Sequence, residues 1–297
     1  MDYLILSHGG CPDGCLAATI AERWCKAQPE VGEVIVRFCD YGVAPNIHEC
    51  VGRRVIITDF GFPIETMLAI AEAALQLTWI DHHKSNEPLV ERMRCNPIPE
   101  LPTIVVFDNN RSGAGLAWDY FCVEATEPWN PKPRPWFVDY VEDLDLWRHA
   151  LPHSKEAVGT YIQSIPLGTD TYGHVLDRIS LETAVRDGRA MTQYINTWAS
   201  NVAGQHRRID FAGYASVPIV SCSYSGISDV LDTLLRVTGA PLALGWFQRG
   251  DGQFQYSLRS KRGGPDVSVI AKQFGGGGHV NAAGFQSIEL FPWEKRV

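Results

Sequence analysis

The sequence predicts an α/β protein with an N-terminal, mainly parallel sheet flanked by helices, joined by a connecting helix to a smaller C-terminal α/β domain. Two observations predict this class. Short apolar runs alternate with stretches in which apolar residues recur at helical spacing, and this order implies parallel strands linked by crossover helices. In addition, 297 residues are enough for two domains that each bury an apolar core.

The first half of the chain shows this alternation most clearly. Leu16, Ile20 and Trp24 have the helical spacing, and Pro63 suits the first position of a helix because it lacks an N–H. The expected order is strand 3–7, helix 14–26, strand 54–58, helix 67–75, strands 77–80 and 103–107, and helix 114–121.

The second half begins with a long stretch of mixed polarity, 181–206, which predicts a connecting helix. The elements expected after it are strand 217–221, helix 227–237, strands 242–247 and 254–259, and helix 267–274. We therefore expect a first domain at 1–180, the connecting helix within 181–211 and a second domain at 212–297.

Composition and charge narrow the class of function. A net charge of −8 argues against a protein that coats duplex nucleic acid, because such proteins bind phosphates through many Lys and Arg side chains. The eight cysteines include no CxxC pair, so we expect buried thiols rather than a disulfide framework or a zinc ribbon. No run approaches about eighteen apolar residues, and the first residues lack a basic region and a cleavage site. We therefore expect a cytoplasmic protein without a membrane partner.

Polar side chains follow three predicted strands at their carboxyl ends, namely His8, Asp59 and the run Asp81-His82-His83. Ligands bind at this edge of open parallel sheets. A single histidine or aspartate there has an ordinary structural role, such as a hydrogen-bonded ring or an N-cap. Adjacent charged and imidazole groups after an apolar strand cost folding free energy unless something binds them. A ligand role is therefore favoured for the Asp-His-His run.

Together with Asp13, these residues offer carboxylate oxygens and imidazole nitrogens. Such a set suits Mn²⁺, or less ideally Mg²⁺, rather than a thiolate-rich zinc site. Asp59 lies between the other two strand ends, where it is well placed to bridge two ions roughly 3.5–4 Å apart. One ion would activate a water for attack on phosphorus, and the other would stabilise charge on the phosphoryl and leaving oxygens. This chemistry is the hydrolysis of a phosphate ester.

Two stretches of the C-terminal half predict anion binding. Consecutive glycines let backbone N–H groups approach a phosphate, and a flexible linker is rarely continued by His-Val-Asn-Ala-Ala-Gly. The candidates in this run are Gly276, Gly277, Gly278 and His279. Arg259 and Ser260 end a predicted strand on groups that can bind phosphate oxygens.

Arg111 and Ser112 form a further candidate pair in the N-terminal half. They precede a predicted helix, and the free amides of a helix start attract anions, so a phosphate contact is one interpretation. A capping role for Ser112 accounts for the same residues equally well.

Four short motifs and the glycine run give the chain a family resemblance. The motifs are His-Gly-Gly-Cys-Pro-Asp-Gly at 8–14, Thr-Asp-Phe at 58–60, Asp-His-His at 81–83 and Val-Glu-Asp-Leu-Asp-Leu-Trp at 141–147. They resemble those of the DHH phosphoesterases, which include RecJ-type exonucleases, nanoRNases, cyclic-dinucleotide phosphodiesterases, exopolyphosphatases and family II pyrophosphatases. The run at 274–284 looks like the signature of the DHH-associated substrate-binding domain.

The resemblance implies roles for individual residues. The implied metal ligands are His8, Asp13, Asp59, His82 and Asp143. Within the fourth motif, Asp143 is chosen over Asp145. Asp81 would orient an imidazole and His83 would face the phosphate, so that Asp59, Asp81 and His83 are the catalytic candidates.

The first motif departs from the family pattern. Many members carry a second aspartate two residues after, or two residues before, the position of Asp13, and this chain has Cys15 and Cys11 there. The spacing from His8 to Asp13 is also one residue longer than in the commoner form. A thiolate at Cys15 would suit a soft metal, but an apolar-packed cysteine that opens a helix is the favoured interpretation. The centre is therefore expected to hold one or two ions.

We expect a phosphoesterase or exonuclease that cleaves phosphodiester or phosphomonoester bonds in short oligonucleotides or small nucleotides by two-metal activation of water. One alternative keeps the site but makes the substrate polyphosphate or pyrophosphate. Another is a catalytically silent nucleotide-binding protein, which the missing aspartate favours. A homodimer is kept as an option for the assembly.

Overall fold

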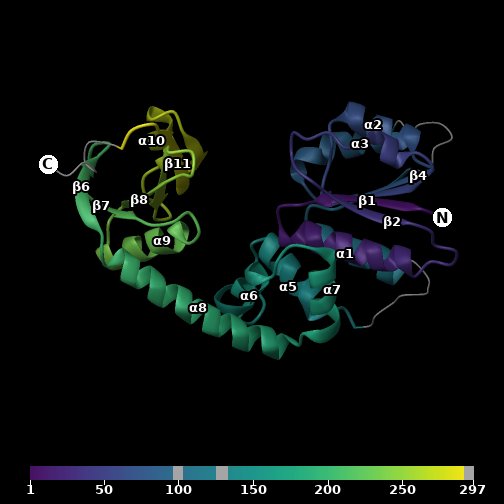
Figure 1. Ribbon diagram of the computed structural model, residues 1–297, viewed down its shortest axis with the longest axis horizontal. Coiled ribbons are helices and arrows are strands. Elements are labelled where there is room, and N and C mark those ends of the chain that lie inside the picture. Colours follow the sequence, from purple (N-terminus) through teal and green to yellow (C-terminus); the bar gives the residue numbers. More distant parts are fainter. Residues whose placement is uncertain (96–102, 125–132, 291–297) are drawn as a thin grey trace. The chain divides into compact units, whose positions relative to one another are not determined.

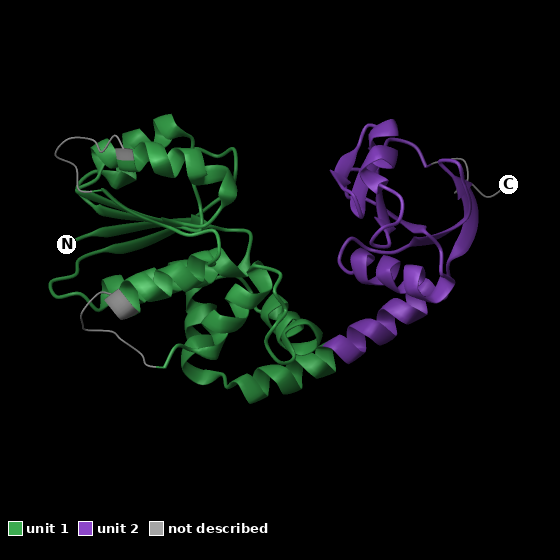
Figure 2. Ribbon diagram, turned by 180° about the vertical axis from the view of Figure 1, so that it is seen from behind, with its two compact units in different colours: residues 1–191 green, residues 192–297 purple. Residues whose placement is uncertain are grey.

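The computed structural model describes residues 1–95, 103–124 and 133–290. The chain divides into two compact units, 1–191 and 192–297, and the division falls inside a long helix (Figure 2). Among the described residues, each unit contains one β-sheet with its own apolar core.

The sheet of unit 1 has five strands in the order β2-β1-β3-β4-β5, and every pairing is parallel. The strands are β1 (Tyr3–His8), β2 (Val34–Cys39), β3 (Arg54–Thr58), β4 (Gln76–Asp81) and β5 (Thr103–Phe107). Because β1, β3 and β4 are neighbours, their carboxyl ends lie side by side at one edge of the sheet. The predicted fold class is confirmed.

Helices cover both faces of this sheet (Figure 1). One face packs against α1 (Pro12–Lys26) and α4 (Gly113–Trp118), and the other against α2 (Ile64–Ala73) and α3 (Glu87–Cys95). Helices α5 (Trp136–Asp145) and α7 (Thr169–Arg178) pack against α1 and belong to the same core as α1 and α4. Successive strand residues alternate between the two cores, as Leu4 and Ile5 do. Both faces are buried, which is why the strands are continuous apolar runs.

Shorter segments complete unit 1. They are the 3₁₀ turns η1 (Ile47–Cys50) and η2 (Lys84–Asn86), the π-type turns η3 (Asp119–Glu124) and η4 (Ser154–Val158), and the helix α6 (Gly159–Ser164).

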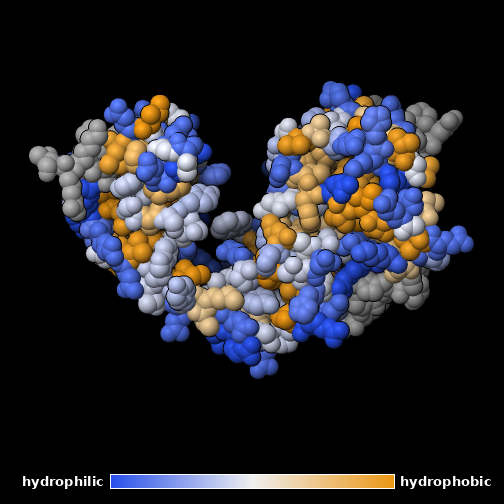
Figure 3. All heavy atoms as spheres, viewed as in Figure 1, coloured by the Kyte–Doolittle hydropathy of each residue, from blue (hydrophilic) through white to orange (hydrophobic). Residues whose placement is uncertain are grey.

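Strand β2 was not among the predicted elements. It is one of the two edge strands of this sheet, its residues are only partly buried, and Phe38 is exposed. Apolar side chains gather over this edge of the sheet in the space-filling view (Figure 3). Arg37 interrupts its apolar run after Val36, so the run is shorter than that of the central strands.

Unit 2 has a six-stranded mixed sheet in the order β10-β11-β9-β8-β7-β6. Its elements are β6 (Arg207–Phe211), β7 (Tyr214–Ser221), α9 (Ile227–Thr238), β8 (Leu242–Gln248), β9 (Phe254–Ser260), α10 (Val267–Gln273), β10 (Gly277–His279) and β11 (Ala282–Ser287). Within the described part of this second sheet, only β7 and β8 pair in parallel, and α9 is the crossover between them. The two faces of the sheet pack against α9 and α10.

The long helix α8 (Leu181–Ala203) occupies the place of the expected connecting helix. The expected segment 181–211 is too long, because residues 207–211 form β6 and pair with β7. Burial of Phe211 in the core of unit 2 holds that strand in the sheet. Within the described ranges, no helix combines the length and apolarity that crossing a membrane requires.

Candidate metal centre

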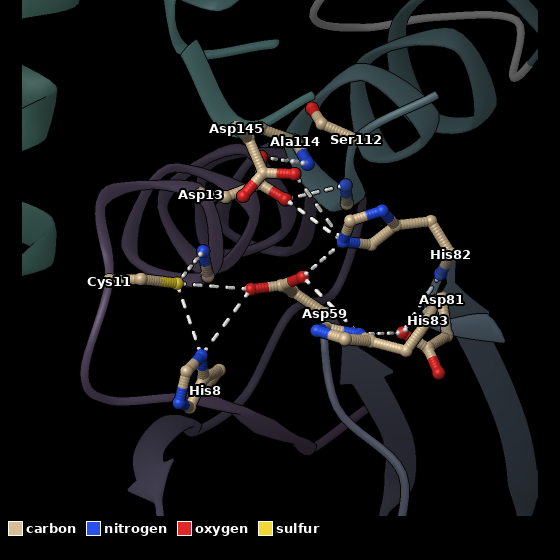
Figure 4. Close-up of polar contacts among 12 residues, drawn as sticks. His8, Cys11, Asp13, Asp59, Asp81, His82, His83, Ser112, Ala114 and Asp145 are labelled. Carbon is tan, nitrogen blue, oxygen red and sulfur yellow. Dashed lines mark hydrogen bonds and ion pairs between the residues drawn. The ribbon is translucent and has the colours of Figure 1, made fainter. Parts of the chain in front are cut away.

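The carboxyl ends of β1, β3 and β4 bring together His8, Asp59 and the segment that begins at Asp81 (Figure 4). Two helices add further side chains. The start of α1 supplies Cys11 and Asp13, and the end of α5 supplies Asp145, which lies above Asp13 in the view. The site is therefore built from several segments of one unit.

Asp59 lies at the middle of this group and is almost fully buried. Its Oδ1 is 3.0 Å from His82 Nε2, and its Oδ2 accepts a hydrogen bond from Cys11 Sγ at 3.3 Å and lies 3.8 Å from His8 Nδ1. Burial opposes its ionisation, but hydrogen bonds from His8 and His82 outweigh burial and lower the pKa of Asp59. One carboxylate is thus shared between two sets of neighbours.

The backbone around Asp59 is unusual. Asp59 has φ of 52°, a left-handed conformation that costs on the order of 1–3 kcal/mol for residues other than glycine. Two glycines allow its carboxylate to sit between helix starts. A Cβ on Gly113 would lie 2.6 Å from Asp59 Cβ, and one on Gly14 would lie 2.9 Å from Asp59 Oδ2. The position of Asp59 is therefore tightly defined.

Asp13 is held by the first turn of α4. Its carboxylate accepts hydrogen bonds from Gly113 N at 2.7 Å and Ala114 N at 3.0 Å, and its Oδ2 lies 3.6 Å from His82 Nε2. A helix start attracts anions, and here the anion is a side chain of the protein itself. Burial, followed by the charges of Asp59 and Asp145, raises the pKa of Asp13.

The fourth motif contributes Asp145 rather than Asp143. Asp145 Oδ2 lies 3.7 Å from His82 Nε2. Asp143 instead accepts hydrogen bonds from Ser154 Oγ and, at 2.9 Å, from Ala150 N. Residues two apart in a helix point to nearly opposite sides, so only one of the two aspartates can face the centre. The choice of Asp143 as a ligand is corrected accordingly.

Asp81 positions the histidines. Its Oδ1 lies 2.8 Å from His83 Nδ1 and accepts a hydrogen bond from His82 N at 2.8 Å, while Asn86 Nδ2 donates to its Oδ2. The hydrogen bond between Asp81 and His83 is the largest cause of the raised pKa of His83. The arrangement matches the orienting role that the resemblance implied for Asp81, and the oriented ring is that of His83.

The two cysteines of the first motif differ in environment. Cys15 is fully buried in the core on the α1 side, and its Sγ accepts a hydrogen bond from Gly168 N at 3.0 Å. Cys11 is the N-cap of α1, and its Sγ lies 3.1 Å from His8 Nδ1. Sequence reasoning treated Cys11 only as a missing aspartate. Its place two residues before Asp13 was the signal that could have identified it as a donor.

The donor set fits divalent cations. In the described part of the chain, three groups have donor atoms within 4.8 Å of one another, namely His8 with Cys11 and Asp59, Asp59 with His82 and His83, and Asp13 with His82 and Asp145. Burial raises the pKa of both Asp13 and Asp145, and the charge on Asp59 adds to the effect. Carboxylates crowded into a buried site repel one another, and cations would neutralise that repulsion.

Arg111 and Ser112 are engaged by protein groups. Arg111 Nε donates to Glu142, and its Nη1 donates to Asp119. Ser112 is the N-cap of α4, where its Oγ accepts a hydrogen bond from Gly115 N at 3.1 Å. The structure thus shows the capping interpretation of Ser112, and the first amides of α4 are taken by Asp13.

The predicted anion-binding residues of unit 2 lie on β9 and β10, which are separated by β11, and Gly276 directly precedes β10. The glycine run ends in β10, which forms the edge of the sheet, so one side of its backbone has no partner strand in the described part of the chain. Gly278 has φ of 141°, which favours glycine. Ser260 and Arg259 end β9, with Ser260 bonded to Asn281 Nδ2 and Arg259 Nη2 to Ser228 Oγ.

Comparisons with known proteins agree with these observations. Residues 217–295 match the DHHA1 domain. An uncharacterized protein of Acanthamoeba polyphaga mimivirus is 26% identical over 308 residues, which cover 98% of this chain and 70% of that protein.

Solved structures add evidence on the fold. The pGpG-specific phosphodiesterase PggH from Vibrio cholerae superposes with a TM-score of 0.51 at 11% identity, covering 96% of this chain and 93% of that one. An uncharacterized protein from Helicobacter pylori G27 gives a TM-score of 0.48 at 16% identity, covering 98% of this chain and 94% of that one. The chain therefore contains a DHHA1 domain at residues 217–295 and shares the fold of the Vibrio cholerae phosphodiesterase.

Proposed function

We propose that the protein hydrolyses phosphate ester bonds of small nucleotides or short oligonucleotides, with divalent cations bound around Asp59. The observation that carries this proposal is the shared Asp59 carboxylate, which faces Cys11 and His8 with one oxygen and His82 with the other. A carboxylate placed in this way suits the bridge of a two-cation centre.

Each side chain of the centre has a distinct role in this proposal. His8, Asp13, Asp59, His82 and Asp145 would hold the cations, and Mn²⁺ or Mg²⁺ suits their oxygen and imidazole atoms. Bound cations supply a water of lowered pKa and neutralise charge on the phosphoryl oxygens. His83 faces the substrate phosphate, and Asp81 fixes its ring through the 2.8 Å contact with Nδ1.

A cavity beside the centre favours a substrate with a base. It has a volume of about 640 Å³ and is lined by aromatic, apolar and a few polar side chains, including Tyr41, Phe60, Phe62, Asn86 and Arg92. The ring of Tyr41 lies 4.7 Å from that of Phe60 and 5.6 Å from that of His8. Aromatic walls bind a nucleobase by stacking, whereas polyphosphate offers nothing to stack.

Unit 2 would have phosphate-binding groups of its own. We assign phosphate contacts to Arg259, Ser260, His279 and the backbone of Gly276, Gly277 and Gly278, because an edge strand leaves N–H groups available for an anion. The Vibrio cholerae neighbour is described as specific for the dinucleotide pGpG, which makes dinucleotides the first substrates to test here.

Hydrolysis of a substrate panel tests the proposal. Product release from dinucleotides, nucleoside 3′,5′-bisphosphates and polyphosphate is measured with Mn²⁺ for the wild-type protein and for Asp59→Asn. We expect nucleotide hydrolysis that the variant loses while its thermal unfolding remains cooperative. Hydrolysis of polyphosphate alone would support the alternative substrate. Nucleotide binding without turnover would support a silent binding protein.

A further inference from the structure

We propose that the centre has two chemically different cation sites, one of which uses the thiolate of Cys11 and selects a borderline-soft cation such as Zn²⁺ over Mn²⁺ or Mg²⁺. The inference rests on the proposed function in that it requires cations at this centre. The first motif then has a different meaning, because Cys11 replaces the missing aspartate as a ligand and the cation site is kept.

The distances among the three donors fit one cation. His8 Nδ1 and Cys11 Sγ are 3.1 Å apart, Cys11 Sγ and Asp59 Oδ2 are 3.3 Å apart, and His8 Nδ1 and Asp59 Oδ2 are 3.8 Å apart. Ligands held tetrahedrally at roughly 2.0–2.3 Å from a zinc ion lie about 3.3–3.8 Å from one another. Three protein donors leave the fourth position for water or substrate, as in catalytic zinc sites.

The donor atoms are already aimed at this position. The ring of His8 is stacked on Phe60 at 5.9 Å between centroids, and its Nδ1 is the atom that faces Cys11. The Cys11 thiol donates to Asp59 Oδ2. A cation between the sulfur and the carboxylate would take the place of that proton, so no side chain must turn to form the site.

Helix capping and core packing account for Cys11 less well than cation binding does. As the N-cap of α1, its Sγ accepts a hydrogen bond from Gly14 N at 3.4 Å, but helix starts prefer Ser, Asp, Asn and Thr for this purpose. Packing suits the fully buried Cys15, whereas Cys11 is partly exposed and its sulfur contacts the polar side chains of His8 and Asp59. Neither role requires these two contacts.

The second site has a different donor chemistry. Asp13, His82 and Asp145 offer only carboxylate and imidazole atoms, with Asp59 Oδ1 beside them. Hard oxygen ligands suit Mn²⁺ or Mg²⁺, and thiolate favours softer ions. Asp59 would bridge the two sites, so the structure assigns a mixed-metal centre to this chain.

Cobalt substitution tests the role of the sulfur without measuring catalysis. Metal-stripped protein is titrated with Co²⁺, and near-ultraviolet absorption is recorded for wild type, Cys11→Ser and the control Cys39→Ser, whose cysteine is also partly exposed but lies outside the donor groups. We expect a sulfur-to-cobalt charge-transfer band in wild type and in Cys39→Ser and none in Cys11→Ser. A band that survives in Cys11→Ser would overturn the inference.

Metal preference gives a second readout. Competition with a chromophoric chelator should show that Cys11→Ser weakens Zn²⁺ binding by more than the roughly 10–100-fold that loss of an outer hydrogen-bond partner costs, with little change for Mn²⁺. Cys11→Asp should move the preference of that site toward Mn²⁺. Co²⁺ binding without a sulfur band would refute the thiolate and leave the proposed function standing. Absence of any cation binding would remove both.

Discussion

The contact between Gly113 and Asp59 yields a quantitative prediction for Gly113→Ala. The added Cβ would lie 2.6 Å from Asp59 Cβ, whereas ordinary contacts begin at 3.4 Å, so Asp59 or the start of α4 must move by about 0.8 Å. Overpacking of this kind costs about 1–3 kcal/mol of folding stability, and alanine's better helix propensity returns about 1 kcal/mol. The protein should therefore remain folded. A displacement of about 1 Å at a reacting centre lowers the rate roughly 100-fold.

The assay compares initial rates of Mn²⁺-dependent nucleotide hydrolysis and the Mn²⁺ affinity from calorimetry. Gly250→Ala is the matched control, because its Cβ meets no atom within 4 Å. We expect Gly250→Ala to behave as wild type and Gly113→Ala to lose activity and cation affinity while it still unfolds cooperatively. Unchanged rates and affinity in a folded Gly113→Ala protein would refute the view that this contact fixes Asp59.

Three further outcomes are expected. Asp145→Asn should abolish activity with little effect on thermal unfolding. Asp143→Asn should mainly lower the melting temperature, because it weakens the contact with Ser154. The opposite pattern in activity assays and thermal unfolding would restore Asp143 as the ligand. Burial lowers the pKa of His82, but its contact with Asp59 and the charge of Asp13 outweigh burial and raise the pKa to about 9. In metal-free protein, protonated His82 therefore stabilises the folded state fully below pH 6.5, and this stabilisation is lost as pH rises through about 9. Mn²⁺ binding requires the neutral ring and should strengthen over the same interval, which calorimetry at several pH values would show; a pH-independent affinity would contradict it. Tyr41→Ala should raise KM for dinucleotides and leave hydrolysis of a base-free phosphate ester unchanged, and equal effects on both would argue against base stacking in the cavity.

The strand ends were predictable because a buried parallel strand is a continuous apolar run. The polar residue that follows such a run lies at the carboxyl edge of the sheet, where ligands bind. His8, Asp59 and the Asp-His-His run were all found in this way. Strand β2 was missed because Arg37 interrupts its apolar run after only three residues.

Two features of the site depended on three-dimensional detail. The choice between Asp143 and Asp145 depends on the rotation of α5 about its axis, which the motif alone does not define. The role of Cys11 depends on the extra residue between His8 and Asp13, because spacing alone does not tell which side chain that loop turns toward Asp59. Only the path of the loop between β1 and α1 shows this.

The hydrogen bonds from the first turn of α4 to Asp13 affect how the centre acquires its ions. Two backbone amides hold this carboxylate in place, so the polypeptide itself preorganises this part of the centre. Ion exchange at Asp13 then requires little refolding, so a wrongly bound cation should be replaceable while the chain stays folded.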